Sequence, residues 1–440
     1  MDATRVRRWW LEHSASVLRV AAVLMGLLAA LKLGDELLRL AWRSGPNAAI
    51  DLKLRYAEVH AWFVGRPVYQ EMSGTAIYPP ASYVMLWPLL GWLPLAQARV
   101  LWAAISAAAL VCASHLLARE SKAKTRLECT FVALTLLSMN ETGVWLGNGQ
   151  LVLLQLPVLL VGLLVFQRGR GTWRDDLVTA GCLLFSLVKH TTVAPFFWLA
   201  FFAPMATRDT PTSARVVRLR PAALVFAGYT AMTLLAVSFM PDGRSQLLAE
   251  RIRAASAGMH GDYADLNSWL SEVGLKRFVP AASITLFCAL GAWTYLYRRA
   301  DLWIRVGVCA LIARFWTYHR LYDDVIVSLA LVTLFRLAKG RTVAGSGSGA
   351  DTDKEETKRQ VLSGTLLGAT SLAMLLPARL HTAPVPWQYL FSWTHAILWL
   401  GILWFLCREA HLETFPRRDL GRKRSPPSRV QARNDRVTHP

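Results

Sequence analysis

Residues 51–80 read DLKLRYAEVHAWFVGRPVYQEMSGTAIYPP, a polar and aromatic stretch in a chain otherwise built from apolar blocks. Asp51 opens it, and apolar residues at three- and four-residue spacing follow: Leu52, Tyr56, Val59 and Phe63. This spacing predicts an amphipathic helix lying along a membrane surface, with the Asp51 carboxylate at one end.

The second half of the stretch predicts a loop. Gly65 and Pro67 break the helix, because proline removes a backbone donor and glycine costs helical stability. Tyr78 precedes two prolines, which disfavours the helical conformation and begins the next element extended. We therefore expect one helix and one loop between two membrane-crossing elements.

The composition places the rest of the chain in a bilayer. Of its 440 residues, 54% are hydrophobic and 18% charged, and the apolar residues come in blocks of about 16 to 20, the length that crosses a ~30 Å hydrocarbon core. The formal charge of +20 falls mainly in short loops and the C-terminal tail, the positive-inside pattern of a polytopic membrane protein. We expect a lipid bilayer as partner, and no nucleic acid.

The sequence predicts an all-α membrane protein of twelve or thirteen spans. Residues 81–97 carry Pro88, Gly91 and Pro94, so this segment either crosses or forms a short re-entrant or interfacial helix. The twelve other expected spans are 16–33, 99–118, 127–145, 150–166, 177–189, 191–206, 221–240, 280–297, 302–317, 324–338, 361–377 and 387–407.

Loop charge predicts the orientation. If 81–97 does not cross, the basic loops at 119–126, 167–174, 215–220, 298–305 and 339–359 share the cytoplasmic side with both termini. The opposite side collects polar residues of six loops: 51–80, 140–150, 189–190, 241–279, 318–324 and 379–381. This convergence predicts a cleft on the extracytoplasmic face.

We expect four parts in the chain. Residues 1–340 form the transmembrane core with a first external loop at 34–80, and 341–360 form a flexible cytoplasmic linker. Residues 361–410 form a transmembrane hairpin, and the basic tail 411–440 is disordered.

Several of these motifs resemble a known family. The Asp51 helix is followed by GRPVY at 65–69, YPP at 78–80, GNGQ at 147–150 and SLVKHTTVAPFF at 186–197. Their order and spacing are similar to the polyprenyl-phosphate-sugar-dependent glycosyltransferases of the GT-C superclass, and most of all to the integral membrane mannosyltransferases of glycosyltransferase family 87. The resemblance covers roughly residues 16–340.

The resemblance implies a GT-C-type helix bundle in a bacterial-type plasma membrane. It implies a polyprenyl-phosphate sugar as donor, a glycolipid or cell-envelope glycan as acceptor, and an acidic base in the first external loop, which is Asp51 by position. Asp35 and Glu36 are weaker candidates for the base. The chain departs from the commoner pattern at His190, where proline is frequent, and at Val152, so the donor and the acceptor stay open.

Sugar transfer from a lipid phosphate needs a base for the acceptor hydroxyl and cations for the departing phosphate. Asp51 is the candidate base, although an Asp at this place also caps helices. The candidate phosphate-binding residues are Lys189, His190, His319 and Arg320. Alternatively, Lys189 snorkels to the interface, and Arg320 pairs with Asp323 or Asp324.

The candidate sugar- and acceptor-binding residues are polar or aromatic: Tyr69, Tyr78, Asn148, Gln150 and Asn267. Each has a simpler interpretation. The tyrosines suit an interfacial aromatic belt, Asn148 and Gln150 a broken helix, and Asn267 the start of an interfacial helix. No spacing of His, Cys and carboxylates predicts a metal site, so we expect no cofactor and find no indication of a divalent metal.

Two other functions stay open. A transporter or flippase of lipid-linked sugars predicts a repeat of two halves and polar residues near the bilayer midplane, whereas the polar residues here cluster at span ends. A structural protein leaves the polar residues on one face unexplained. A glycosyltransferase is the leading hypothesis.

Overall fold

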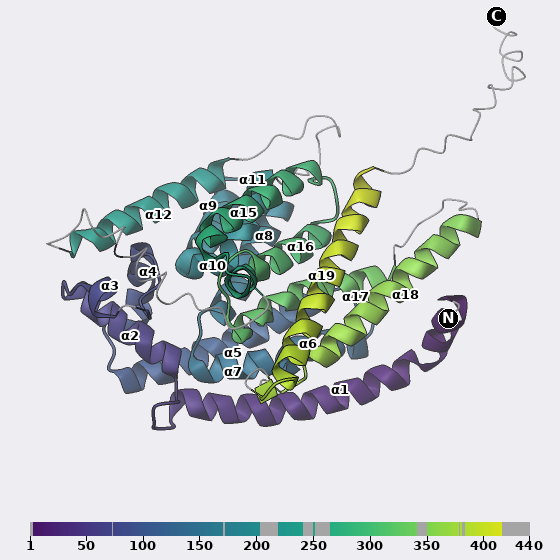
Figure 1. Ribbon diagram of the computed structural model, residues 1–440, viewed down its shortest axis with the longest axis horizontal. Coiled ribbons are helices and arrows are strands. Elements are labelled where there is room, and N and C mark those ends of the chain that lie inside the picture. The colour runs from purple at the N-terminus through teal and green to yellow at the C-terminus, as the bar shows by residue number, and fades with distance from the viewer. Residues whose placement is uncertain are drawn as a thin grey trace, which may run out of the picture.

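The computed structural model describes residues 3–72, 74–169, 172–202, 219–240, 250, 265–340, 350–377, 379–380 and 383–415. Within these ranges the secondary structure is helical, without a strand (Figure 1). The helices are α1 (Ala3–Ala41), α2 (Ile50–Phe63), α3 (Val68–Glu71), α4 (Pro80–Leu90), α5 (Leu95–Glu120), α6 (Arg126–Ser138), α7 (Asn140–Asn148), α8 (Val152–Arg168), α9 (Trp173–Ser186), α10 (His190–Val193), α11 (Phe197–Phe202), α12 (Arg220–Ser238), α14 (Leu266–Glu272), α15 (Val279–Leu296), α16 (Leu302–Phe315), α17 (Ser328–Ala338), α18 (Ala350–Ala373) and α19 (Trp387–Thr414), with 3₁₀ turns η1 (Leu187–Lys189), η2 (Ala194–Phe196), η3 (Lys276–Phe278) and η4 (Leu321–Val327).

Six helical segments are long and apolar enough to cross a membrane, and a bent pair, α7 with α8, makes a seventh if it counts as one span. The six are Glu12–Ala41, Leu95–Glu120, Trp173–Phe202, Arg220–Ser238, Lys276–Leu296 and Trp387–Thr414. A helical membrane protein is therefore supported, although the expected twelve or thirteen spans are not reached by this measure. Several other expected spans are helices of only 11 to 14 residues, namely α6, α16 and α17.

Helix α4 accounts for the ambiguous segment 81–97. It has 11 residues, or about 16 Å at 1.5 Å per residue, roughly half of a hydrocarbon core. Pro94 precedes α5, which begins at Leu95 and runs unbroken to Glu120. Residues 81–97 are thus a short helix followed by the first turn of the next long one.

Helix breaks shape the middle of the bundle. Gly149 has a φ of 74° and ends α7, and α8 leaves at an angle of 111° to it. A left-handed backbone of this kind suits glycine. A Cβ at Gly149 would lie 2.7 Å from the Leu52 Cβ, so the break also lets α2 approach closely.

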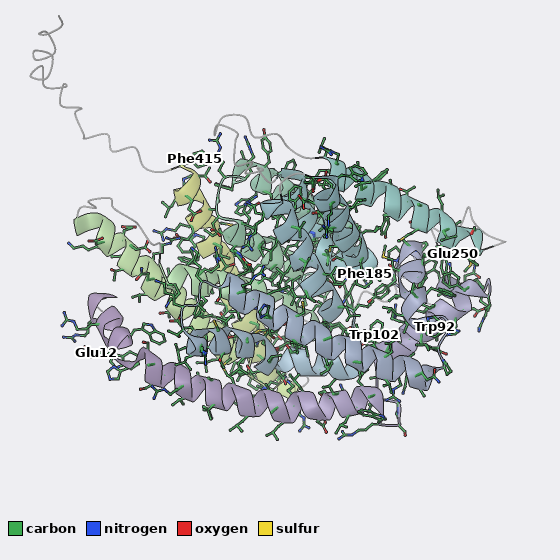
Figure 2. The ribbon with its side chains drawn as sticks, turned by 180° about the vertical axis from the view of Figure 1, so that it is seen from behind. Glu12, Trp92, Trp102, Phe185, Glu250 and Phe415 are labelled. Atoms are coloured by element: carbon green, nitrogen blue, oxygen red, sulfur yellow. The ribbon has the colours of Figure 1, made fainter. Side chains whose placement is uncertain are left out.

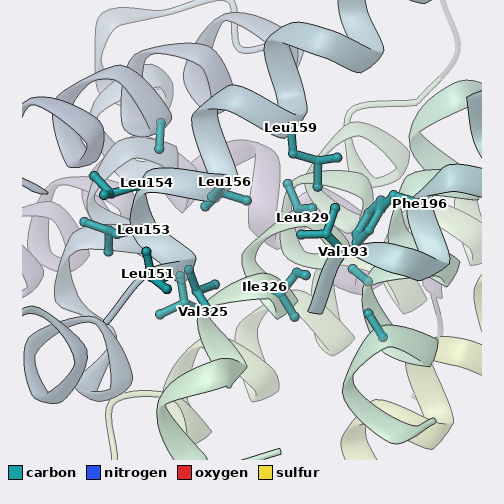
Figure 3. Close-up of a cluster of buried hydrophobic side chains, with 14 of the residues drawn as sticks. Leu151, Leu153, Leu154, Leu156, Leu159, Val193, Phe196, Val325, Ile326 and Leu329 are labelled. Atoms are coloured by element: carbon teal, nitrogen blue, oxygen red, sulfur yellow. The ribbon is translucent and has the colours of Figure 1, made fainter. Parts of the chain in front are cut away.

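The apolar core holds the broken segments together. Leu151, just before α8, lies beside Val325 of η4, with Leu153 and Leu154 on its other side, and Leu159 lies near Leu329, which is followed by Phe196 (Figure 3). Each of these side chains is at most 4% exposed. In a bilayer such contacts stabilise the bundle through close van der Waals packing, and they fix the polar ends of the same segments.

The molecule has two distinct ends (Figure 2). Trp92 and Glu250 lie at one, where α2, α3 and α4 gather, and Glu12 and Phe415 lie at the other. The second end collects the basic loops: Arg168 pairs with Glu120, Lys339 with Glu128 and Arg359 with Glu409. Arg336 also pairs with Asp301, so the loops at 119–126, 298–305 and 339–340 lie together, as the charge pattern predicted.

The C-terminal part differs from its expected boundaries. Helix α18 begins at Ala350, so residues 350–360, expected within a flexible linker, are helical. Helix α19 continues to Thr414 and includes the first residues of the expected tail. Residues 341–349 and 416–440 lie outside the described residues, as does His381.

Candidate functional site

Asp51 lies inside helix α2 and does not cap it. The N-cap is Ala49, which has a φ of 51° and makes no side-chain cap hydrogen bond. The Ala49 backbone N–H instead donates to the Gly147 carbonyl, at 3.1 Å. The capping alternative for Asp51 is therefore wrong. Its carboxylate interacts with the Gln150 side chain and nearby cations.

Burial raises the pKa of the Asp51 carboxyl above its usual value, because water no longer solvates the charge fully. A hydrogen bond from the Gln150 side chain opposes that rise, as do the charges of Arg55, Lys189 and Arg320. The structure thus brings Asp51 near three of the other expected site residues. A carboxylate with a raised pKa is a stronger base once ionised.

The GNGQ segment supplies only one of its two amides to Asp51. Asn148 accepts a hydrogen bond from Arg39 Nη2 at 3.1 Å, which ties it to α1. Gln150 lies just past the Gly149 turn and reaches Asp51. The alternative interpretation, that an amide braces a broken helix, therefore applies to Asn148.

Lys189 is buried, 8% exposed, and makes an ion pair with Asp323 of η4. Its ammonium also lies 5.4 Å from the centre of the Tyr322 ring. Burial alone would raise the pKa of the Asp323 carboxyl, yet Lys189 and the Arg320 backbone N–H hold it below its usual value. The snorkelling alternative for Lys189 is therefore wrong.

Arg320 makes a different contact from the one expected. Its Nε donates to the Tyr318 hydroxyl, and its backbone N–H donates to Asp323 Oδ2 at 3.2 Å. Asp324 pairs with Arg314, and both are fully buried. The residues YHRLYDD do form an ion-pair network, but their carboxylates neutralise Lys189 and Arg314.

His319 is fully buried, and its backbone N–H donates to Asp265 Oδ2 at 3.2 Å. Burial lowers the pKa of His319 to about 4, so its imidazole is neutral at pH 7. It was expected as a phosphate-binding cation, but its Nδ1 donates to the Thr317 carbonyl at 3.0 Å, so the neutral ring leaves only an acceptor at Nε2. His190 is half-buried in α10 on the same side of the bundle.

The aromatic and loop candidates make contacts of their own. The Tyr69 hydroxyl donates to the Tyr78 carbonyl at 2.6 Å, and both rings are buried. Asn267 is 4% exposed at the start of α14, where Asp265 caps the helix through the Ser268 N–H at 2.7 Å. Asn267 thus begins a short helix, as the simpler interpretation held.

The weaker base candidates lie elsewhere. Asp35 pairs with Arg43 at an exposed place on α1, and Glu36 lies 2.6 Å from Arg39 Nε. Neither contributes to the surroundings of Asp51.

The sequence analysis missed a charged pair on α2. Arg55 and Glu58 are buried and joined by an ion pair of 2.7 Å. Their spacing from Asp51, four and then three residues, was a readable signal that they share its helix face. The apolar spacing of Leu52 and Val59 indicated the neighbouring face of the helix instead.

The arrangement brings together one half-buried carboxylate, one amide and two cations from separate elements. Among the residues that the structure describes, no group of three or more His, Cys, Asp or Glu side chains could hold a metal ion. In comparisons with protein-family models, curated proteins and solved structures, the chain gave no match.

Proposed function

We propose that this protein is a membrane glycosyltransferase. It transfers a hexose, most simply mannose, from a polyprenyl-phosphate donor to a glycolipid or cell-envelope glycan. The observation that carries the proposal is the Asp51 carboxylate, which is half-buried and has a raised pKa within reach of the charges of Lys189 and Arg320. The motif resemblance supplies the donor class, and the positive-inside pattern supplies the extracytoplasmic face.

The proposed reaction is a single displacement. The acceptor hydroxyl oxygen bonds to the anomeric carbon, the bond between that carbon and the phosphate oxygen breaks, and the phosphate leaves with the electron pair. Asp51 takes the hydroxyl proton, and the anomeric configuration inverts. A general base of this kind contributes about 10²- to 10⁴-fold to a rate.

Each neighbour of Asp51 has a role in this scheme. Arg320 and Lys189 stabilise the negative charge of the leaving phosphate, and Asp323 fixes the position of Lys189. Gln150 orients the carboxylate. His319 has no donor role in this scheme, because its neutral ring donates from Nδ1 to the Thr317 carbonyl and leaves Nε2 as an acceptor.

The test is sugar transfer in membranes that contain equal amounts of wild type or Asp51→Asn. A radiolabelled polyprenyl-phosphate mannose is supplied, and the lipids are extracted. We expect a labelled product from the wild type and a rate about 10²- to 10⁴-fold lower from the variant. The matched control is Asp35→Asn, which removes an exposed, ion-paired carboxylate from α1 and should keep the wild-type rate. Full activity of Asp51→Asn would refute the base assignment.

One observation favours the transporter alternative. Lys32 and Glu141 lie inside the bundle, Glu141 fully buried, and Lys32 donates to both oxygens of Asn140. Ionisable residues within membrane helices often mark a transport path. If the wild type transfers no sugar but moves a fluorescent polyprenyl-phosphate sugar between the leaflets of a vesicle, the transporter replaces the enzyme.

A further inference from the structure

One face of α2 carries three charged residues followed by a tryptophan. Asp51, Arg55, Glu58 and Trp62 follow one another at spacings of four, three and four residues, which places them on one side of the helix. Arg55 is 6% exposed and Glu58 is fully buried. Burying two such charges costs several kcal/mol for each ion unless their partners are well placed.

Arg55 has well-placed partners on two elements. Its Nη1 lies 2.7 Å from Glu58 Oε2, within α2. Its Nη2 donates to the Thr75 carbonyl at 2.9 Å, and its guanidinium lies over the Tyr78 ring, 4.4 Å from the ring centre. A single side chain therefore connects α2 with the segment that leads into α4.

The backbone hydrogen bonds of that segment do not reach α2. Its backbone bonds are local: the N–H groups of Thr75 and Ala76 donate to Met72, and that of Ile77 donates to Thr75. Tyr69 holds the Tyr78 carbonyl from the side of α3. Arg55 thus provides a direct link from Tyr78 to the helix that carries Asp51, one turn away from the carboxylate.

Glu58 holds Arg55 in place from within α2. Its Oε2 accepts from the Tyr83 hydroxyl of α4 at 3.4 Å, in addition to pairing with Arg55. Trp62 stacks on the Tyr83 ring, with ring centres 4.6 Å apart. The partners of Arg55 are therefore themselves held by packing, which makes the guanidinium position rigid.

We propose that Arg55 is a positioning residue: it holds Thr75 and Tyr78 against α2 and thereby forms the wall of the site beside Asp51, while Glu58 holds Arg55. The effect of Arg55 on sugar transfer rests on the proposed function. The ordering of residues 74–78 is independent of that function, because it follows from the contacts alone.

Amide hydrogen exchange tests the ordering in the full chain, purified into nanodiscs. In Arg55→Gln, and also in Glu58→Gln, we expect the amides of residues 75–78 to exchange at least tenfold faster than in the wild type. The amides of α5 should keep their rates. Unchanged exchange at 75–78 would overturn the proposal, as would an equal increase along the whole chain, which would mean a general loss of stability.

The matched control is Arg66→Gln. Arg66 pairs with Glu71 in the same loop, but its side chain is 57% exposed, and exposed pairs contribute little. This variant should leave exchange at 75–78 unchanged. If Arg55→Gln does not accumulate, Tyr78→Leu removes the ring beneath the guanidinium and keeps every charge. It should show the same local increase, and a wild-type pattern there would equally refute the link.

Kinetics separate positioning from mere stability. In Arg55→Gln we expect kcat to fall by about 100-fold, as for a misplacement of about 1 Å, with little change in the donor KM. Arg55→Lys should recover only a small part, because an ammonium cannot match the planar fork. A wild-type kcat in Arg55→Gln would refute positioning. Faster exchange at 75–78 without any wild-type transfer would instead refute the proposed function alone.

Discussion

The two ends of the bundle are both rich in charge but use it differently. At the end that carries the basic loops, carboxylates meet cations directly: Glu120 takes Arg168, and Glu409 takes Arg359 at 2.5 Å. A cavity of about 240 Å³ lies there, lined by both signs of charge, with Arg336 and Asp301 on its wall. Direct pairing of this kind is typical of an ion-pair network that stabilises the fold.

At the other end, Asp51 stands apart. None of the ion pairs found between described residues includes it, although three cations are near enough to act on its charge. Lys189, by contrast, is directly paired with Asp323. The comparison teaches that charge density alone does not distinguish a candidate site from a structural network, whereas the pairing of each charge does.

The largest expected effect tests whether Lys189 is as firmly paired as the charges of the opposite end. Lys189→Met leaves Asp323 buried without its partner, which should cost about 3 to 5 kcal/mol of unfolding free energy. Unfolding in mixed micelles measures this. Lys189→Met with Asp323→Leu should recover much of the loss, and the exposed control Arg66→Gln should cost under about 1 kcal/mol. A small loss in Lys189→Met would show that the pair is not structural.

A smaller effect is expected at the Gly149 turn, which lies at the Asp51 end. Gly149→Ala forces an alanine into a φ of 74° and its Cβ to 2.7 Å from that of Leu52. The cost should be about 1 to 3 kcal/mol, with a fall in transfer because α2 shifts. Gly181→Ala is the control, since a Cβ there meets nothing within 4 Å. Equal stability of the two variants would contradict the close approach of α2.

The smallest expected effect is a difference in pH response between two carboxyls. The pKa of Asp51 is raised, so its stabilising contribution is present below its unfolded pKa and is lost as pH rises through the folded pKa. The pKa of Asp323 is lowered, so its contribution is present above the unfolded pKa and is lost as pH falls through the folded one.

Melting temperatures measured against pH can separate the two carboxyls. At neutral pH, Asp51→Asn should raise the melting temperature slightly, and Asp323→Asn should lower it. As the pH is lowered, transfer by the wild type should be lost with a midpoint above the usual pKa range of an aspartate, because the base must be ionised. A lower melting temperature in Asp51→Asn would mean that its charge stabilises the fold, as the charges do at the opposite end.

The helical membrane class and the gathering of the basic loops could be predicted from the sequence. Hydrophobic periodicity and loop charge are properties of short segments, so they do not depend on how distant parts of the chain pack. The break at Gly149 was also visible as GNGQ. The angle between α7 and α8 was not, because it depends on the close packing of Leu52 against the turn.

The pairings within the site could not be predicted in the same way. Lys189 and Asp323 are 134 residues apart, and no local pattern connects them. Arg55 and Glu58 had a readable spacing, but apolar residues on the adjacent face of α2 dominated the interpretation. Once a helix is buried on two faces, as α2 is at Leu52 and Glu58, hydrophobic periodicity no longer identifies its most informative side.

The length of α1 has a consequence for the lipid environment. Its 39 residues measure about 58 Å, well beyond a ~30 Å hydrocarbon core, so α1 must tilt or protrude. Hydrophobic mismatch changes the tilt of a helix with the thickness of the bilayer. Because Arg39 near the end of α1 holds Asn148, two residues before Gln150, we expect acyl-chain length to alter the geometry around Asp51.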